Sequence, residues 1–595
     1  MRKIAVCITV VCTIGWGIAT LLGTATAQET QVNQTVLLNN HGHVVPLREL
    51  ENRDIAHIGR LDRTDLGDFG GMLERYAPVA HFELASGSEG YLRLDEELKY
   101  YNTLVFALTA ADLSDPRLLQ FIKTQAVGKQ VILAVFGDGN GLHALNFEQF
   151  PILWAPAINP VSAKNAAMSI FGGIACTGRL PQSFSPRFTK GAGFTTAQTR
   201  LEYADAAVFG IDGQRLTANI DGIAMEAVRE HAAPGIVVMA VKSGKVIFEK
   251  AYGYHTYDQR RQTKVTDIFD MASITKITAT TPTIMRLVER GVINLDSTMG
   301  HYLTQAQGTN KENTKLRDVM LHEAGFIPFI PFYRDLKAGD LSTDSSAEYS
   351  IKVADGCYIR TGYYEKVMWP TMLASKMNKV GEYVYSDISM YVMKEVAEHQ
   401  TGLPIQDYIQ REFYRPLGMK TAGYLPRERF TRDRIVPTED DKTFRKTLLQ
   451  GYVHDQGAAM AGGIAGHAGL FATANDLAIY GQLLLNRGEY GGERFFTAAT
   501  VDLFTSNQSP TSRRGLGFDR WDPDRSKEYP SKLASSATFG HTGYTGTCIW
   551  IDPAEQLIYI FLSNRVHPAV STKLYSLNVR SRIQDAIYEA IRAAK

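Results

Sequence analysis

The pattern of apolar and polar positions divides the chain into two regions. In residues 28–205, short continuous apolar runs such as 103–108 and 131–136 alternate with stretches of helical periodicity such as 116–127. Continuous apolar runs of this length predict strands that are buried on both faces, and strands that alternate with helices are typical of a parallel sheet. We therefore predict an α/β module with a mostly parallel sheet in this region.

The second region, residues 206–595, has predicted strands near both of its ends. Residues 235–248 and 547–562 each contain two apolar runs around a turn signal, so each predicts a β-hairpin. A helical pattern over residues 574–593 predicts a terminal helix that covers the resulting sheet. We predict an α+β domain in which an antiparallel sheet, flanked by helices, brings the two ends of the region together around a helical subdomain.

Composition and charge exclude several classes of protein. The chain has 595 residues, 45% apolar and 21% charged, which is typical of a multidomain globular protein. Its 63 basic and 62 acidic side chains leave no excess positive charge for nucleic acid, so we expect no nucleic-acid partner. Cys176, Cys357 and Cys548 are widely spaced and odd in number, which indicates no disulfide framework.

The first 27 residues have the pattern of a secretory signal peptide. Met1-Arg2-Lys3 is a short basic start, residues 4–22 are apolar, and Ala25-Thr26-Ala27 is a small-residue cleavage site. We therefore expect a mature protein that is periplasmic or secreted. The apolar run is long for a signal peptide, so a membrane anchor formed by an uncleaved signal is the alternative.

Ser273-Ile274-Thr275-Lys276 is the sharpest chemical motif, and it opens a helical pattern that ends at Glu289. On a helix, positions i and i+3 lie on one face, so Lys276 can reach the hydroxyl of Ser273. A serine hydroxyl becomes a nucleophile when a neighbouring base removes its proton. A buried lysine whose pKa is lowered by desolvation and nearby charge can be that base.

Two companion motifs follow in the order and at the approximate separations of the penicillin-recognising serine enzymes. They are Tyr385-Ser386-Asp387, which precedes a predicted helix, and His541-Thr542-Gly543, which starts a strand of the second hairpin. Three more blocks match at residues 320–326, 416–419 and 466–477. On these residues, the region from about 210 onward resembles the serine beta-lactamase superfamily and is most similar to its class C branch, with esterases and D-alanyl-D-alanine peptidases.

The resemblance implies a role for each matched residue. Ser273 would be the acylated nucleophile, and Lys276 and Tyr385 would share its deprotonation. Tyr385 would also pass a proton to the leaving group and then activate the acceptor. The backbone N–H groups of Ser273 and Tyr544 would form the oxyanion hole, while His541 and Thr542 would face a carboxylate or the acyl tail of the substrate.

Two departures from the family pattern bear on the substrate. Asp387 stands where the class C pattern has asparagine, and an ionised carboxylate only accepts hydrogen bonds. Recognition of an amide side chain should weaken, while pairing with Lys276 should strengthen. His541 stands where the family usually has lysine, so we expect a group that is only partly charged near neutral pH. Both changes argue against an efficient beta-lactamase.

Residues 326–370 form an unusually aromatic insertion between the first two motifs. It contains Phe326, Phe329, Phe332, Tyr333, Tyr349, Tyr358, Tyr363, Tyr364 and Trp369. One interpretation is the core of a helical subdomain. The other is an apolar wall for a bulky acyl donor or acceptor, such as a sterol-like alcohol. His454 and His467 are candidates for the same cleft, although structural roles suit both.

The N-terminal module resembles the C-terminal α/β sandwich domain of family 3 glycoside hydrolases. The matching stretches are residues 36–40, 45–47, 172–173 and 178–181. That family carries its nucleophile on a barrel domain of about 250 residues, which the sequence ahead of Gln28 does not hold. We therefore expect a structural or glycan-binding module that does not hydrolyse glycosides alone.

Together these observations predict an exported serine hydrolase that forms an acyl-enzyme on an ester or amide. An esterase or acyltransferase is the first hypothesis, with a small-molecule acyl donor and acceptor and no metal or cofactor. A D-alanyl-D-alanine carboxypeptidase or beta-lactamase is the second. A non-catalytic glycan-binding or beta-lactam-sensing protein is the third. The predicted domains are a signal peptide at 1–27, an α/β module at 28–205 and a hydrolase domain at 206–595.

Overall fold

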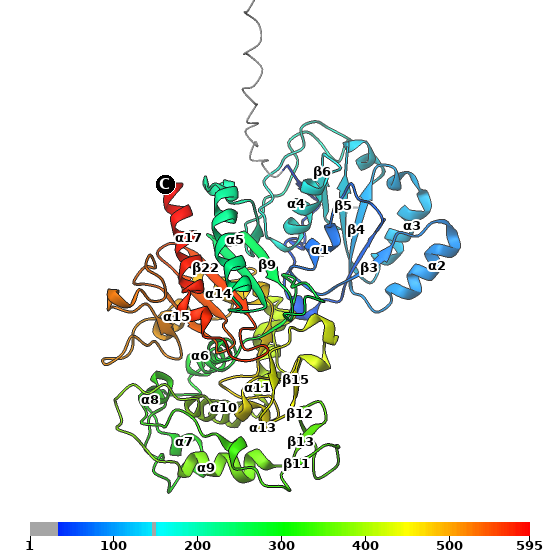
Figure 1. Cartoon of the computed structure of the whole chain (residues 1–595). Coiled ribbons are helices and arrows are strands. Elements are labelled where there is room, and N and C mark those ends of the chain that lie inside the picture. The colour runs from blue at the N-terminus through cyan, green and yellow to red at the C-terminus, as the bar shows by residue number, and fades with distance from the viewer. Residues whose placement is uncertain (1–33, 146–149) are drawn as a thin grey trace, which may run out of the picture. The chain divides into compact units, whose positions relative to one another are not determined.

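The computed structural model describes residues 34–145 and 150–595 (Figure 1), and these residues belong to one compact unit. The predicted signal peptide at 1–27 lies outside the described residues, so localisation stays a prediction. Within the described ranges, no helix combines the length and the apolar character that a membrane crossing requires. The boundary predicted near residue 206 also stays a prediction.

The N-terminal module is built on a six-stranded sheet with the order β1-β6-β5-β4-β2-β3. Its strands are β1 Val36–Leu38, β2 Ile55–Gly59, β3 Val79–Glu83, β4 Thr103–Thr109, β5 Gln130–Phe136 and β6 Ile152–Ala155. All neighbouring strands run parallel except β1, which is antiparallel to β6. The predicted α/β fold class with a mostly parallel sheet is therefore confirmed.

Helices α1 Phe69–Leu73, α2 Gly87–Leu98, α3 Pro116–Gln125 and α4 Pro160–Phe171 surround this sheet (Figure 1). The sequence sets their limits locally. Asp115 accepts a hydrogen bond from the Arg117 N–H of α3, and Asn159 accepts one from the Ser162 N–H of α4. Each helix begins with a proline. Gly172, with φ of 79°, ends α4 in the left-handed conformation that favours glycine.

The order of the parallel strands reverses at β2, whose neighbours are β3 on one side and β4 on the other. Open α/β sheets have a crevice outside the carboxyl ends of their strands at such a point. A cavity of about 490 Å³ is found here, lined by residues that include His57, Gly59, Glu74, His81 and Ala107. The module therefore contains a cavity at the carboxyl ends of its strands, where this type of sheet is expected to have one.

The second region is built on a seven-stranded sheet with the order β19-β20-β21-β22-β8-β9-β7. Its strands are β7 Glu202–Tyr203, β8 Gly235–Lys242, β9 Lys245–Gly253, β19 Asp519–Arg520, β20 Phe539–Thr542, β21 Cys548–Asp552 and β22 Leu557–Ser563. Both predicted hairpins are present, as β8–β9 and β21–β22, and β22 pairs with β8. The sheet is antiparallel except at β7, which runs parallel to β9.

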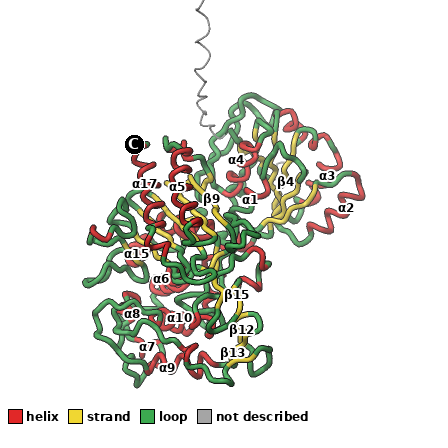
Figure 2. The backbone as a smooth tube through the Cα atoms, in the orientation of Figure 1, coloured by secondary structure: helices red, strands yellow, loops and turns green. Residues whose placement is uncertain are grey.

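Helices cover both faces of this sheet. Helix α5 (Gly213–Arg229) and the terminal helix α17 (Val579–Ala593) pack on one face with residues such as Ile220 and Ile587 (Figures 1 and 2). Helix α14 (Ala474–Leu485) packs on the other face. The sheet and its helices thus join the two ends of the region, as predicted. This arrangement confirms the α+β architecture.

The middle of the second region consists of short helices joined by long loops (Figure 2). Its helices are α6 Thr281–Glu289, α7 Met299–Tyr302, α8 Leu316–Leu321, α9 Trp369–Ala374, α10 Ile388–Thr401, α11 Ile405–Ile409, α12 Arg415–Leu417, α13 Gln456–Met460 and α15 Ala498–Thr505, with α16 Lys573–Ser576 near the terminus. Short strands accompany them: β10 Phe269–Asp270, β11 Leu341–Ser342, β12 Ile351–Ala354, β13 Cys357–Ile359, β14 Glu439–Asp441, β15 Thr447–Leu449, β16 Phe471–Ala472, β17 Glu489–Tyr490 and β18 Glu493–Arg494.

Three π-helical segments, 276–280, 364–368 and 410–414, each end two residues before a proline. Proline lacks an N–H group and clashes with the carbonyl of the residue four positions earlier. A π-helical turn, with its wider hydrogen-bond spacing, accommodates this defect within a continuous helix. The proline at 282 therefore explains why the helix that begins at the S-x-x-K motif opens with a π segment.

The aromatic insertion mostly forms a core. Of its nine aromatic side chains, Phe326, Phe332, Tyr363, Tyr364 and Trp369 are buried. This confirms the subdomain-core interpretation for those five residues and leaves no continuous apolar wall made from them. Phe329 differs from them, because 61% of its surface is exposed.

Candidate active site

Ser273 lies between strand β10 and the π-helical start of the helix that continues as α6. The preceding residue, Ala272, has φ of 46°, a left-handed conformation that a residue with a Cβ rarely adopts. Its backbone N–H donates to Oδ1 of the buried Asp270 at 2.8 Å, which holds the turn. Backbone strain of this kind is concentrated at functional sites, where the surrounding structure maintains it.

Lys276 is fully buried and its ammonium group contacts three oxygen atoms. Its Nζ lies 2.8 Å from Ser273 Oγ, 2.8 Å from Asp387 Oδ1 and 3.4 Å from the backbone oxygen of His467. The contact with Ser273 is the one that the S-x-x-K spacing predicts. The contact with Asp387 confirms the expected pairing of these two side chains across 111 positions of sequence.

The predicted lowering of the pKa of Lys276 is wrong. Desolvation is the largest influence and lowers this pKa, but the combined attraction and hydrogen bonds of Asp387 and Tyr385 outweigh it. The pKa of Lys276 is therefore raised, and the side chain carries its proton near neutral pH. The motif lysine is thus present as a cation that donates to Ser273, not as a neutral base.

Three hydrogen bonds, one to a histidine ring and two to backbone oxygens, fix the second motif. The N–H of Ser386 donates to His322 Nδ1 at 3.2 Å, and its hydroxyl donates to the backbone oxygen of Ile327 at 2.6 Å. The N–H of Asp387 donates to the backbone oxygen of Pro328 at 2.8 Å, directly before the start of α10. These bonds position the Asp387 carboxylate against Lys276 and leave the exposed Phe329 next to the motif.

The ring of Tyr385 lies among two cations and two histidines. Lys276 Nζ is 4.9 Å and Arg514 Cζ is 5.9 Å from the ring centroid. The rings of His322 and His541 lie at centroid distances of 4.7 and 6.0 Å from it. Positive charge at these distances favours a negatively charged oxygen or ligand beside Tyr385.

His541, on β20, is 3% exposed. Burial, together with the positive charges of Arg514 and Lys276, lowers its pKa to about 3. The expectation that His541 is partly charged near neutral pH is therefore wrong, since the imidazole is neutral there. Its Nδ1 lies 2.7 Å from the backbone oxygen of Thr542.

The end of the third motif lies against the first. A Cβ atom at Gly543 would come within 2.6 Å of the Met271 backbone oxygen, so only glycine permits this approach. Tyr544, the next residue, is 51% exposed. Its backbone oxygen accepts from Arg565 Nε at 2.7 Å, and its ring stacks on His454 at 5.2 Å.

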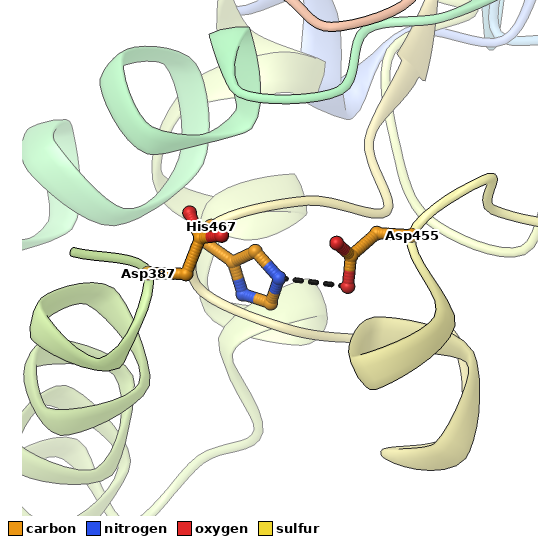
Figure 3. A group of neighbouring side chains, drawn as sticks. All are labelled: Asp387, Asp455 and His467. Atoms are coloured by element: carbon orange, nitrogen blue, oxygen red, sulfur yellow. Dashed lines mark hydrogen bonds and ion pairs between the residues drawn. The ribbon is translucent and has the colours of Figure 1, made fainter. Parts of the chain in front are cut away.

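Asp387, Asp455 and His467 form a group of possible metal ligands (Figure 3). One ligand atom from each lies within 4.8 Å of the others, and it is the one group of this kind among the described residues. However, His467 Nε2 lies 2.9 Å from Asp455 Oδ1, and the Lys276 ammonium already contacts Asp387. Because a second cation would be repelled by this ammonium, we assign Asp387 to charge balance with the lysine and Asp455 to its contact with His467.

Ser273, Lys276, Tyr385, Asp387 and His541 are thus brought together as the sequence predicted, and Thr542, Gly543 and Tyr544 follow His541 along the chain. Sequence reasoning gave no role to His322, Arg514, Asp455 or Arg565, which adjoin this site. His322 lies within a matched block, at 320–326, and this was the available signal for it. The others have no motif around them that indicates their place.

Comparisons with known proteins identify the family of the second region. The beta-lactamase family model matches residues 220–581. The chain is 32% identical over 366 residues to the N-acetylmuramyl-L-alanine amidase of Bacillus subtilis (strain 168). This alignment covers 57% of the chain and 78% of the amidase. It is 28% identical over 395 residues to a putative D-alanyl-D-alanine carboxypeptidase of Salmonella paratyphi A, covering 62% and 87% of the two chains.

Among solved structures, EstCE1, described as a hydrolase with promiscuous acyltransferase activity, matches with a TM-score of 0.47 and 20% identity. The match covers 63% of this chain and 99% of that one. The residues matched by the family model begin after the N-terminal module, so the resemblance of that module to glycoside hydrolases stays a prediction. Since the model spans more than half of the sequence, the chain belongs to the beta-lactamase family and is a serine hydrolase or acyltransferase of that superfamily.

Proposed function

We propose that this enzyme hydrolyses amide bonds of small cell-wall peptides through an acyl-enzyme on Ser273. The observation that carries the proposal is the Lys276 ammonium, placed 2.8 Å from both Ser273 Oγ and Asp387 Oδ1 beside the Tyr385 ring. The names of the relatives give the substrate class. The Bacillus amidase and the Salmonella carboxypeptidases are both named for cleavage of an amide bond that involves alanine.

Acylation begins when Ser273 Oγ attacks the carbonyl carbon of the amide. Because Lys276 already holds its proton, the proton of the serine passes to the oxygen of Tyr385 while Tyr385 gives its own hydroxyl proton to the departing nitrogen. The C–N bond breaks, and the tyrosine is left with one proton, as before. The amine leaves and the acyl group remains on Ser273 as an ester.

Deacylation repeats these steps with water. Water attacks the ester carbonyl and passes a proton to the Tyr385 oxygen, while Tyr385 gives its own hydroxyl proton to Ser273 Oγ as the C–O bond breaks. The carboxylic acid is released and the enzyme is restored. The backbone N–H groups of Ser273 and Tyr544 are the proposed donors to the oxyanion in both halves, and the contact of Gly543 with the Met271 carbonyl keeps the two segments close.

A second candidate is ester cleavage with transfer of the acyl group to an alcohol. The observation that favours it is a set of exposed aromatic side chains near the site. Phe329 is 61% exposed and follows Pro328, which binds Asp387 N–H, while Tyr544 is 51% exposed. Apolar surface at these positions is suited to an aromatic or sterol-like acceptor.

The test follows products by mass spectrometry with N-acetylmuramyl-L-alanine, a D-alanyl-D-alanine peptide, nitrocefin and p-nitrophenyl esters. Each reaction is run with and without an added alcohol, and with Ser273→Ala as the matched control. Release of alanine from either peptide by the wild type alone supports the proposal. Ester turnover with acyl product on the alcohol, and no peptide cleavage, would replace it with the second candidate.

We also propose that the enzyme is exported and that its N-terminal module contacts cell-wall glycan. The motivation is the signal pattern in residues 1–27 and the resemblance of the module to a glycoside hydrolase domain. Titration of the purified protein with peptidoglycan oligosaccharides tests the second point. Saturable binding that is unchanged in Ser273→Ala would support a glycan site separate from the active site. Absence of binding would contradict the proposed glycan contact.

A further inference from the structure

The turn between strands β20 and β21 carries one of the two proposed oxyanion donors, the N–H of Tyr544. A hydrogen bond from the Gly546 N–H to the Gly543 oxygen, at 3.0 Å, closes this turn. Tyr544 is the second residue of the turn, a position whose own N–H the turn does not use. Among the described residues, neither this N–H nor that of Ser273 donates to a protein acceptor. Both can therefore donate to a substrate oxygen.

Two threonine hydroxyls fix the turn to the segment that precedes the nucleophile. The hydroxyl of Thr545 donates to the backbone oxygen of Asp270 at 2.8 Å, and that of Thr547 donates to the backbone oxygen of Met271 at 3.2 Å. These bonds set the distance between the two segments that carry the proposed donors. Both threonines follow Tyr544, so its own peptide group needs a further contact to be held in place.

Arg565, two residues after strand β22, binds the part of the turn that contains Tyr544. Its Nε donates to the backbone oxygen of Tyr544 at 2.7 Å, and its backbone N–H donates to that of Thr545 at 3.2 Å. Its Nη1 donates to the backbone oxygen of Ser571 at 2.8 Å. Its guanidinium carbon lies 4.8 Å from the ring centroids of both Tyr544 and Tyr575. The guanidinium therefore has a fixed position, and it fixes the backbone of Tyr544.

The charge of Arg565 has no acidic partner among the described residues. Arg565 is 3% exposed, so water compensates little of this charge. Burial lowers its pKa, and Tyr575 and Tyr544, rather than a carboxylate, oppose this shift. The buried Arg445, by contrast, pairs with Asp441 at 2.8 Å. Because an unpaired buried cation costs stability, its presence beside the oxyanion hole indicates a functional role.

We propose that Arg565 is a positioning residue for the oxyanion hole. It holds the backbone of Tyr544 in place for the developing oxyanion, and its unpaired charge adds positive potential there. The negative charge forms only in the transition state and the tetrahedral intermediate, so the contribution affects catalysis more than substrate binding. The inference rests on the acyl-enzyme and the oxyanion hole of the proposed function, and it applies to amides and esters alike.

The experiment measures turnover of p-nitrophenyl acetate, per active site, by the wild type, Arg565→Met and Arg565→Lys. Loss of one oxyanion donor costs about 10²- to 10³-fold in kcat, and loss of its support should cost part of that. We expect Arg565→Met to lower kcat about 10- to 100-fold and to change KM less than about threefold, because both half-reactions use the same oxyanion hole. Arg565→Lys keeps the charge but cannot bridge the same two backbone oxygens, so we expect a loss of about 3- to 10-fold.

Phenylboronic acid gives a second measurement. Ser273 Oγ adds to its boron and releases a proton to water, which leaves a tetrahedral anion on the serine. Its inhibition constant should rise about 10-fold or more in Arg565→Met and less in Arg565→Lys. Arg582→Met is the matched control and should keep wild-type values, because Arg582 pairs with Glu226 at 2.8 Å. A role confined to folding would lower thermal stability but leave kcat per active site and the inhibition constant unchanged, which would overturn the inference.

These reagents separate the role of Arg565 from the choice of natural substrate. If neither cell-wall peptide releases alanine but Arg565→Met shows both losses, the role of Arg565 stands and the proposed substrate fails. If the peptides are cleaved but both Arg565 variants keep the kcat of the wild type, the role of Arg565 fails alone. Should Arg565→Met not fold, Arg565→Lys decides, because wild-type kcat in that variant would overturn the inference.

Discussion

The two regions of the molecule both bury an ionisable side chain, with opposite results. In the N-terminal module, His57 is 5% exposed, and burial with the nearby His81 lowers its pKa to about 3. In the catalytic domain, Lys276 is fully buried, yet its pKa is raised because Asp387 and Tyr385 attract its charge. Burial removes a charge unless a partner is buried with it.

This difference indicates where chemistry is possible. The His57 imidazole is neutral and lines a cavity at the edge of a parallel sheet, which suits a structural or binding role. The Lys276 ammonium is held as a cation against a serine hydroxyl and a carboxylate. If this contrast holds, substitutions in the two regions should differ strongly in their effect on activity.

The largest effect is expected for the nucleophile. Ser273→Ala should reduce amide or ester turnover by a factor of about 10³ or more, since the acyl-enzyme cannot form. His57→Ala, in the module, should leave kcat/KM within about threefold of the wild type. Initial rates at fixed enzyme concentration measure both. Equal losses of turnover in the two variants would contradict the assignment of catalysis to the domain that contains Ser273.

Loss of the lysine should be the next most severe change. Lys276→Met removes the donor to Ser273 and leaves Asp387 partly buried without its cation, so we expect turnover to fall about 10² to 10⁴-fold and stability to fall by about 1–3 kcal/mol. Adding Asp387→Asn should recover stability but not activity. Urea unfolding and rate measurements on both variants test this. Recovery of activity in the double variant would show that Lys276 acts only as a structural partner.

A smaller effect is expected for Asp387→Asn alone. Asparagine can donate as well as accept, so turnover of nitrocefin should rise several-fold above the wild-type level. Unchanged or lower nitrocefin turnover would contradict the explanation given for position 387.

The same substitution has a signature in the dependence of stability on pH. The folded-state pKa of Lys276 is raised above its usual 10.5, so the ion pair stabilises the wild type fully below that pH. This contribution is lost as the pH rises through the folded-state value. The difference in unfolding free energy between wild type and Asp387→Asn should be constant from pH 7 to 9.5 and shrink above pH 10.5. Urea titrations across this range measure it.

The smallest effect concerns His57. Its folded-state pKa of about 3 lies below the usual 6.5, so the unfolded chain binds a proton that the folded chain does not. Stability should fall as the pH drops from 6.5 toward 3, by at most about 1.4 kcal/mol per pH unit for this group. His57→Asn should remove the contribution of this group to the fall of unfolding free energy with decreasing pH, as measured by urea unfolding. An unchanged slope would mean that His57 is protonated in the folded state.

Much of the fold was predictable because it follows from local patterns. Apolar runs located β4, β5 and both hairpins of the catalytic sheet, and the three motifs located Ser273, Tyr385 and His541. The protonation states were not predictable. The charge of Lys276 depends on a carboxylate 111 positions away, and that of His541 depends on burial and on Arg514. Such effects arise only when distant segments pack together.

Mass spectrometry tests most directly whether Ser273 is the nucleophile. The enzyme is quenched with acid during turnover of N-acetylmuramyl-L-alanine and digested to peptides. We expect one adduct with the mass of the N-acetylmuramyl acyl group on the peptide that contains Ser273, and none in Ser273→Ala. An adduct on another residue, or cleavage with no covalent intermediate in a rapid-quench series, would contradict it.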